Sequence, residues 1–258
     1  MSAALRSEGE LQHQTVGENG TLTWLGHATV LLATASGTRI IFDPWIEGNP
    51  KSPIDMSELG SIDAIAVTHG HFDHMGSVVA LAETTEAVVV CVPEMAAYFS
   101  SFGIANIVDM NKGGTVAVGD ATLTMVSADH SCGLFVGDDV ANAYGGNSVG
   151  FVVSLPAGEG GPVYISGDTN VFGDMALIRD LYAPEICLIP IDGRYNMGPR
   201  EAAYAVKLLG VSRMVPYHYG TFPVLTGTPE ALRTEMLATS SGAKIVAIDP
   251  GQSVALTG

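Results

Sequence analysis

The chain has 258 residues, of which 47% are apolar, and its 27 acidic and 11 basic residues give a net charge of −16. This length and apolar content allow a large hydrophobic core. The acidic balance argues against a nucleic-acid partner, because contact with phosphate backbones depends on clustered Lys and Arg. No stretch approaches the roughly 20 consecutive apolar residues that a membrane helix requires, so we expect no membrane partner.

The organisation of the chain is predicted to be simple. Residues 1–20 are polar and lack an apolar run, so we expect an N-terminal extension and neither a signal nor a transit peptide. Residues 21–258 contain no Pro/Ser-rich linker, low-complexity tract or sequence repeat, which favours a single domain. Three scattered cysteines without an export signal favour a reducing, cytoplasmic location. The sequence leaves the oligomeric state open, and a homo-oligomer is compatible with it.

Short apolar runs separated by Gly or polar clusters predict strands along most of the chain. They cover residues 21–25, 29–33, 39–42, 64–67, 87–92, 123–127, 150–154, 163–166, 186–189, 214–216 and 244–248. Helices are predicted from Ser77 onward, from Pro93 to near Gly103, from Gly173 to Leu181, over Glu201–Leu209, and after the N-cap Thr228. Strands followed by helices in each half are compatible with two mixed sheets that helices cover on their outer faces.

One short segment, Thr68–Gly76, which we predict to be a loop, holds four residues of the kinds that bind metals. His69, His71, Asp73 and His74 lie there between a buried strand and the start of a helix, a common place for a site in an α/β protein. Zinc takes nitrogen and oxygen ligands of this kind. A catalytic zinc site with an open position takes three ligands from the protein. The four candidate ligands in this segment therefore indicate two metal ions.

Three further residues of the same kinds follow apolar runs elsewhere in the chain. His130, Asp168 and His218 each end a predicted strand, so all three could converge on one edge of a sheet. A dinuclear site needs about three ligands beyond the four in the segment. We therefore expect these three residues to complete it.

Several sequence blocks make the chain similar to the metallo-β-lactamase superfamily from about residue 21 to the C-terminus. More narrowly, it resembles the small metal-dependent hydrolases of unassigned substrate, which are related to ascorbate-6-phosphate lactonase-like proteins. The resemblance implies an α/β protein with an αββα sandwich and two metals at one edge. The blocks are His69-Gly70-His71-Phe72-Asp73-His74, Trp24-Leu25-Gly26-His27, Phe42-Asp43-Pro44, Gly48-Asn49-Pro50, Ser166-Gly167-Asp168-Thr169, Asn196-Met197-Gly198-Pro199 and His218-Tyr219-Gly220-Thr221-Phe222-Pro223.

The resemblance also assigns roles to individual residues. It implies that Asp168 bridges both ions and that Asp43 accepts a hydrogen bond from a liganding imidazole. The cofactors would be two divalent ions, with zinc the first choice and manganese, iron or nickel as alternatives. The ligands of the first metal would be His69, His71 and His130, and those of the second Asp73, His74 and His218.

The substrate is less well defined than the metals. The segment Ile191-Asp192-Gly193-Arg194 departs from the pattern expected of relatives, which weakens any inference of substrate from them. A glycine-rich loop, residues 133–147, follows His130 and is predicted to border the site, although it could be a surface hairpin without substrate contact. Candidate substrate contacts, for each of which a structural role is an alternative, are His27, Arg194, Tyr195 and Tyr219.

The ligand set predicts hydrolysis of a small-molecule ester, lactone, amide or phosphodiester. A hydroxide shared by two metals would be the nucleophile, and Asp73 or Asp168 would accept or transfer the proton. One alternative is an iron-dependent redox enzyme of the same fold. Superfamily oxygen reductases, however, usually carry Glu where this chain has His71. The other alternative is a non-catalytic metal-binding protein with closed coordination.

Overall fold

The computed structural model describes residues 19–136 and 141–258. Most of the predicted N-terminal extension therefore lies outside the described residues. Two seven-stranded sheets dominate the described part. The first runs in the order β16 (Ser253–Ala255), β1 (Thr21–Trp24), β2 (Val30–Ala33), β3 (Arg39–Phe42), β4 (Ala64–Ala66), β5 (Val88–Cys91) and β6 (Ile107–Asp109). The second runs in the order β15 (Lys244–Ile245), β14 (Arg213–Tyr217), β13 (Ile186–Pro190), β12 (Val163–Ile165), β11 (Val149–Ser154), β8 (Ala121–Ser127) and β7 (Thr115–Val118).

Both sheets follow the same plan, although the sequence shows no repeat. In the first sheet, β16, β1, β2 and β3 pair antiparallel, and β3, β4, β5 and β6 pair parallel. In the second sheet, β7, β8, β11 and β12 pair antiparallel, and β12, β13, β14 and β15 pair parallel. The predicted pair of mixed sheets is therefore confirmed.

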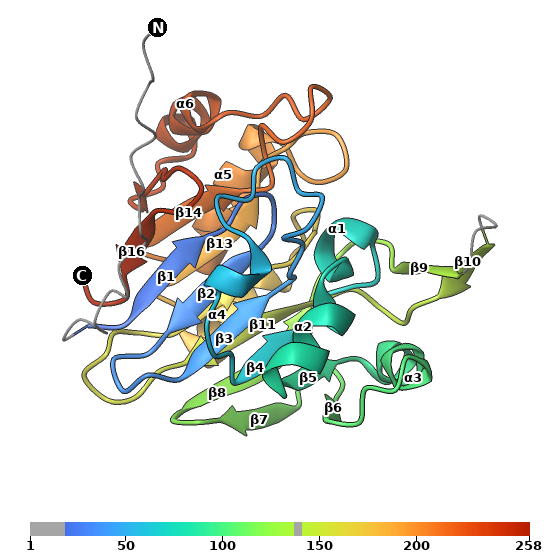
Figure 1. Cartoon of the computed structure of the whole chain (residues 1–258). Helices are drawn as coiled ribbons and strands as arrows, with labels where there is room; N and C mark the ends of the chain where they lie inside the picture. Colours follow the sequence, from blue (N-terminus) through green and yellow to red (C-terminus); the bar gives the residue numbers. More distant parts are fainter. Residues whose placement is uncertain (1–18, 137–140) are drawn as a thin grey trace, which may run out of the picture.

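Helices cover the outer faces of both sheets (Figure 1). The helices α2 (Val78–Thr85) and α3 (Pro93–Ser101) bury Leu81, Met95 and Phe99 against the first sheet. A second cluster joins the outer face of the second sheet to α4 (Met175–Tyr182), α5 (Pro199–Leu209) and α6 (Pro229–Thr239). Helix, sheet, sheet and helix layers make up the αββα sandwich that the resemblance implied.

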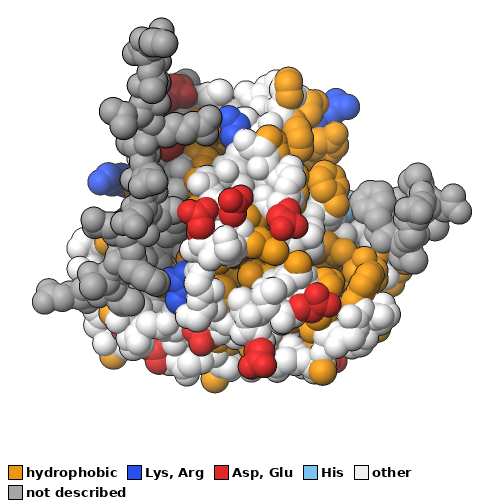
Figure 2. All heavy atoms as spheres, viewed as in Figure 1, with side chains coloured by type: hydrophobic (Ala, Val, Ile, Leu, Met, Phe, Trp, Pro, Cys, Tyr) orange, Lys and Arg blue, Asp and Glu red, His pale blue; other side chains and the backbone are white. Residues whose placement is uncertain are grey.

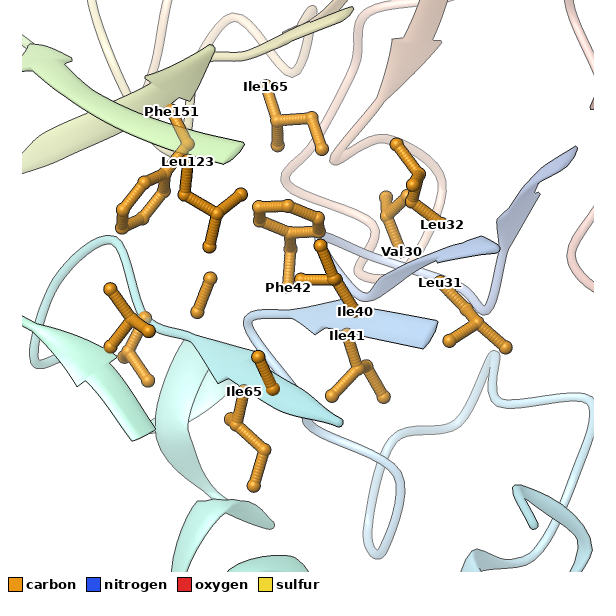
Figure 3. Packing of buried hydrophobic residues seen from close by; sticks show 14 of the residues in the cluster. Val30, Leu31, Leu32, Ile40, Ile41, Phe42, Ile65, Leu123, Phe151 and Ile165 are labelled. Atoms are coloured by element: carbon orange, nitrogen blue, oxygen red, sulfur yellow. The ribbon is translucent and has the colours of Figure 1, made fainter. Parts of the chain in front are cut away.

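The main core lies between the two sheets. Figure 3 shows Val30, Leu32 and Phe42 of the first sheet facing Leu123, Phe151 and Ile165 of the second. The rings of Phe42 and Phe151 are 6.0 Å apart, and both are fully buried. Each such side chain contributes roughly 1.5–3 kcal/mol by leaving water. This packing fixes one sheet against the other, and with them the strand ends that carry the site.

The strands that the sequence did not predict lie mainly at the sheet edges. The strands β6, β7 and β16 are edge strands with half-exposed side chains, and the edge strand β15 is shorter than predicted. An edge strand buries little, so its apolar pattern is weak. The glycine-rich segment 133–147 contains a two-stranded sheet of β9 (Gly133–Val136) and β10 (Ala141–Tyr144), where we had expected a loop.

The structure also includes a short 3-10 helix, η1 (Met56–Glu58), and a one-turn helix, α1 (Phe72–Met75). In the described part of the chain, no helix has the length and apolar character needed to cross a membrane.

Candidate metal centre

The chemically interesting residues follow strands that run in the same direction. The pairings make β1, β3 and β4 point one way in the first sheet, and β8, β12, β13 and β14 one way in the second. The ends of such strands meet at one edge, where sites of α/β proteins usually form. The residues that follow these ends are His27, Asp43, His69, His130, Asp168, Asp192 and His218.

Several of these residues adopt the left-handed backbone conformation. The φ angles are 54° at His27, 48° at Asp43 and 56° at His218. Asp and His visit this region more readily than most residues, and each such position still costs of order 1–3 kcal/mol. The turns therefore need support from their surroundings. One support is the hydrogen bond from the His218 backbone N–H to the His27 carbonyl, at 2.9 Å.

Glycine allows the close approach of the two sheets beside the site. Gly167 has a φ of 62°, and a Cβ there would lie 2.6 Å from the Cβ of Thr68. Asp168 follows immediately. The backbone of the second sheet can thus bring Asp168 against the ligands that the first sheet provides.

The segment Thr68–Gly76 is only partly the loop that we predicted. His69 and His71 precede α1, whereas Asp73 and His74 lie on it. The N-terminal end of a helix favours a carboxylate such as that of Asp73. His69 and His71 cluster with His130, whereas Asp73 and His74 cluster with His218.

Three imidazoles form what we call the first ligand group: His69, His71 and His130. The Nε2 of His69 lies 2.9 Å from the Nδ1 of His71, and one nitrogen of each of the three rings lies within 4.8 Å of the others. All three rings present nitrogen atoms to one point. This group comes from both sheets, since His130 follows β8.

Asp73, His74 and His218 form the second ligand group. The Oδ2 of Asp73 lies 3.7 Å from the Nε2 of His218 and 3.9 Å from the Nε2 of His74. Asp168 lies between the two groups. Its Oδ1 is 3.3 Å from the Nε2 of His74, and its Oδ2 is 3.2 Å from the Nε2 of His218 and 3.7 Å from the Nε2 of His130. The structure thus brings all seven predicted ligands together.

Buried atoms without partners mark this place as suited to cations. The Nε2 of His74, both ring nitrogens of His218 and the Oδ1 of Asp168 are buried and have no hydrogen-bond partner among the described residues. A buried polar atom left unsatisfied costs about 1–3 kcal/mol. Imidazole nitrogens and carboxylate oxygens are ligands of divalent metals. The donor set therefore fits the predicted ions.

Groups behind the ligands fix the orientation of the rings. The Oδ2 of Asp43 lies 2.8 Å from the Nδ1 of His74, in the supporting position that the resemblance implied. Because an ionised carboxylate only accepts hydrogen bonds, His74 donates from Nδ1 and keeps Nε2 free for a cation. Asp43 also accepts hydrogen bonds from the backbone N–H and the hydroxyl of Thr68, at 2.8 and 2.7 Å.

Within residues 19–136 and 141–258, the outer nitrogens of His69 and His71 contact only hydroxyl groups. The Nδ1 of His69 lies 3.0 Å from the Oγ1 of Thr68, and the Nε2 of His71 lies 3.4 Å from the Oγ of Ser131. Since the Thr68 hydroxyl already donates to Asp43, it accepts from His69. His69 is thus linked to the supporting carboxylate of Asp43 through Thr68.

The electrostatics of the two groups differ accordingly. Burial lowers the pKa of His69, His71 and His130, so these rings are neutral near pH 7. A neutral imidazole is the form that binds metal. In the second group, burial also opposes the charged form, but Asp168, Asp43 and Asp73 outweigh it and raise the pKa of His74 to about 10. The surrounding carboxylates likewise raise the pKa of His218 well above its ordinary value.

The carboxylates of the site are shifted the opposite way. Burial alone would raise the pKa of Asp168, yet His218 and His74 hold it well below its ordinary range. Burial likewise opposes the ionised form of Asp73, but His74, His218 and His27 keep its pKa low. Both carboxylates are therefore ionised at neutral pH. Their negative charge favours the binding of a cation at the second group.

His27 is buried within the second ligand group, because one nitrogen of its ring lies within 4.8 Å of a ligand atom of each of the other three residues. Its Nε2 lies 2.8 Å from the Oδ2 of Asp73, and its Nδ1 lies 2.9 Å from the Oγ1 of Thr221. Burial and the nearby His218 lower its pKa to about 4, so the ring is neutral at pH 7. It donates from Nε2 to Asp73 and accepts from Thr221. These contacts agree with the alternative of a structural, hydrogen-bonded role for His27. Contact of His27 with substrate stays a prediction.

The other candidate substrate contacts lie at different depths. Arg194 and Tyr195 are exposed on the segment after β13, and their backbone N–H groups donate to Asp192. Tyr219 instead stacks on Trp24, with ring centres 5.3 Å apart, and packs against the core. Its packing explains its position without a substrate. Contact with substrate stays a prediction for all three residues.

Sequence reasoning missed two features of the site. It did not identify Asp192, a buried carboxylate whose Oδ2 lies 3.0 Å from the Nδ1 of His218. The available signal was its position after an apolar run, the same signal that pointed to Asp168. It also did not predict that the segment 133–147, expected to border the site as a loop, contacts the metal motif as the sheet of β9 and β10: Gly70 donates its N–H to the Sγ of Cys132 at 3.3 Å, and a Cβ on Gly70 would lie 2.6 Å from Leu134.

Comparison with known proteins agrees with this architecture. The family model described as the beta-lactamase superfamily domain matches residues 38–219. A UPF0173 metal-dependent hydrolase of Koribacter versatilis is 46% identical over 211 residues, which cover 82% of this chain and 89% of that protein. Another, of Rubrobacter xylanophilus, is 43% identical over 233 residues, which cover 90% of this chain and 95% of that protein.

Solved structures show the same fold. Igni18, a metallo hydrolase of the archaeon Ignicoccus hospitalis, matches with a TM-score of 0.79 and 29% identity, covering 92% of this chain and 97% of that one. The two mixed sheets, the ligand-bearing strand ends and the close relatives lead to one assignment. The chain belongs to the UPF0173 metal-dependent hydrolases of the metallo-β-lactamase superfamily.

Proposed function

We propose that the chain is a hydrolase that uses two divalent cations to cleave a small ester, lactone, amide or phosphodiester. Zinc is the first choice for both cations. The first ligand group would hold one cation, the second would hold the other, and Asp168 would contact both. The observation that carries the proposal is the pair of ligand groups on either side of Asp168, whose buried Oδ1 lacks a hydrogen-bond partner in the described part of the chain.

The chain's own residues would orient and supply this chemistry. These residues would hold two cations, whose chemistry would be to provide a hydroxide nucleophile and to stabilise negative charge on the substrate oxygen. Asp73 is suited to hold or transfer a proton, because 16% of its side chain stays exposed whereas Asp168 is almost fully buried. His27 holds the Asp73 carboxylate by its hydrogen bond to Oδ2, the oxygen that also lies nearest His74 and His218. We therefore assign proton transfer to Asp73 before Asp168.

Solvent access supports catalysis over closed, structural coordination. Asp73 and His130, at the edges of the two groups, keep 16% and 11% of their side-chain surface exposed. A structural metal site is closed, whereas a catalytic site keeps an open position. The exposed ligand edges allow a small molecule to reach both groups.

Surface charge supports a small-molecule substrate over a nucleic acid or membrane partner. The face in Figure 2 carries scattered Asp and Glu side chains with few Lys or Arg, in line with the net charge of −16. Such a surface does not attract phosphate backbones or anionic lipid. We also propose that the protein works in the cytoplasm, and a homo-oligomer is compatible with the site.

Reconstitution of the purified protein tests the function. Metal-free protein would be loaded with zinc, manganese, iron or nickel, and each form assayed on lactones, phosphodiesters, amides and β-lactams, with Asp168→Ala as the control. We expect close to two zinc ions per chain and turnover of at least one substrate class outside the β-lactams. Full activity after complete chelation would overturn the proposal. Bound iron with a redox-active spectrum would favour the redox alternative.

A further inference from the structure

Asp192 lies beside the outer nitrogen of His218 as Asp43 lies beside that of His74, although only the Asp43 contact also has the geometry of a hydrogen bond. The Oδ2 of Asp192 is 3.0 Å from the Nδ1 of His218, and the Oδ2 of Asp43 is 2.8 Å from the Nδ1 of His74. Both carboxylates are almost completely buried. A buried carboxylate beside the outer nitrogen of a liganding imidazole fixes the ring and increases the basicity of its other nitrogen.

The sheet itself places Asp192 beside His218. The parallel strands β13 and β14 pair Pro190 with Tyr217, so Asp192 and His218 follow neighbouring strand ends. The backbone N–H of Ile191 donates to the carbonyl of Tyr217 at 3.3 Å, and that of Gly227 donates to the carbonyl of Asp192 at 3.1 Å. A Cβ on Gly227 would lie only 1.5 Å from the Ile191 carbonyl oxygen, so glycine is required there.

The same carboxylate organises the chain segment that follows it. The Oδ1 of Asp192 accepts the backbone N–H groups of Arg194, Tyr195 and Asn196, at 2.7, 2.8 and 3.3 Å. Its Oδ2 accepts the side-chain amide of Asn196 at 2.8 Å. The segment 193–196 is thus wound around one carboxylate. This segment carries two of the exposed candidate substrate contacts.

His218 needs such support more than the other ligands do. Its φ of 56° is a costly conformation for a residue with a side chain, and it persists only where the surroundings fix it. Its Nδ1 faces Asp192, and its Nε2 faces Asp168 and Asp73. The ring therefore sits between one carboxylate on the outer side and two on the ligand side.

We propose that Asp192 is a positioning residue that fixes the His218 imidazole for the second cation and joins the segment 193–196 to that ligand. The proposal rests on the proposed two-cation function. The binding of the second cation and the conformation of the segment 193–196 would depend on each other, because the Asp192 carboxylate contacts both His218 and this segment. Removal of Asp192 should weaken the second cation selectively, leave the first in place and loosen the segment.

Zinc titration of the metal-free full-length chain tests the cation. The variants are Asp192→Asn, Asp192→Ala and Asn196→Ala, each titrated against a chromophoric chelator. Asp63→Asn is the matched control, because Asp63 also accepts a backbone N–H, that of Arg39 at 2.7 Å, but contacts no ligand. We expect the second zinc to bind about 10–100-fold more weakly in Asp192→Ala, with the first unchanged. Asp192→Asn, which preserves the side-chain size, should show a smaller loss and decides the question if Asp192→Ala fails to fold.

Asn196→Ala separates the two functions of the carboxylate. It removes one hydrogen bond of the segment 193–196 and leaves the contact between Asp192 and His218 in place. We expect near-normal zinc binding and a raised KM with little change in kcat. Wild-type affinity for both zinc ions in Asp192→Ala and Asp192→Asn would overturn the proposal.

A measurement without metal distinguishes this proposal from the proposed function. NMR of ¹⁵N-labelled histidine rings in the metal-free protein should show a slowly exchanging Nδ1 proton of His218 that Asp192→Ala loses. If the wild-type chain takes up fewer than two zinc ions, the proposed function fails, and the ring proton still decides the role of Asp192. Equal protection of that proton in wild type and Asp192→Ala would overturn the proposal.

Discussion

The two ligand groups of the candidate metal centre are supported in different ways. In the first group, the outer nitrogens of His69 and His71 meet the hydroxyls of Thr68 and Ser131. In the second, the outer nitrogens of His74 and His218 meet the buried carboxylates of Asp43 and Asp192. Carboxylate support increases ligand basicity and adds negative charge near the cation. We therefore expect the second group to hold its cation more tightly than the first.

The largest effect should come from the residue that belongs to both groups. Asp168→Ala removes the carboxylate whose oxygens lie 3.3 Å or less from His74 and His218 and 3.7 Å from His130. The variant should lose both cations and reduce hydrolysis to background. Metal analysis by mass spectrometry and an activity assay would measure this. Two tightly bound ions in the variant would mean that Asp168 does not link the groups.

Substitution of the residues that contact the outer nitrogens of the ligands compares the two ligand groups directly. Asp43→Ala should weaken the second cation about 10–100-fold, the usual cost of losing a partner behind a ligand. It should affect the first cation less, because His69 reaches Asp43 only through Thr68.

Ser131→Ala provides the comparison, because its exposed contact to His71 is long, at 3.4 Å. It should weaken the first cation less than about threefold, since neutral hydrogen bonds contribute little net free energy. Zinc competition titrations of both variants measure these effects. Equal losses in Asp43→Ala and Ser131→Ala would contradict the distinction between carboxylate and hydroxyl support.

Stepwise chelation should release the two cations in order. The zinc of the first ligand group should leave first, at a chelator concentration about tenfold lower, because fewer carboxylates surround it. Zinc content and activity would be followed as chelator is added. His71→Ala identifies the step, since it should lack the early phase and keep the late one. Simultaneous release, or early loss from the second group, would argue against the comparison.

The ligands that lie close together in the sequence were easier to predict than those that stand alone. Four ligands within Thr68–Gly76 form a pattern that chance rarely produces, so their chemistry was evident. His130, Asp168 and His218 are single residues at strand ends, and only the need for further ligands and the family resemblance identified them. Asp192 has the same position after a strand, yet no count of ligands demanded it. A supporting residue acts through geometry that spacing alone does not encode.

The fold was predictable where burial is strong and less so where it is weak. Apolar runs such as Val149–Ser154 and Ile186–Pro190 lie in sheet interiors, and their patterns were clear. The edge strands Ile107–Asp109 and Ser253–Ala255 contain only half-buried and exposed residues, so their sequences resemble those of loops. The one-turn helix Phe72–Met75 is too short to show an apolar periodicity. The sequence pattern there therefore predicted a loop.

An effect smaller than that of Asp43→Ala should come from Gly70, because the hairpin of β9 and β10 contacts the metal motif at this residue. A Cβ on Gly70 would lie 2.6 Å from Leu134 and 3.1 Å from the Gly133 carbonyl, so Gly70→Ala must displace the hairpin base. Overpacking of this kind costs about 1–3 kcal/mol. The variant should unfold at a lower temperature and bind the first cation a few-fold more weakly, with the second unchanged. Gly173→Ala is the control, since a Cβ there meets open space. A loss at the second cation instead would show that the hairpin supports both groups, and the two halves would no longer be independent.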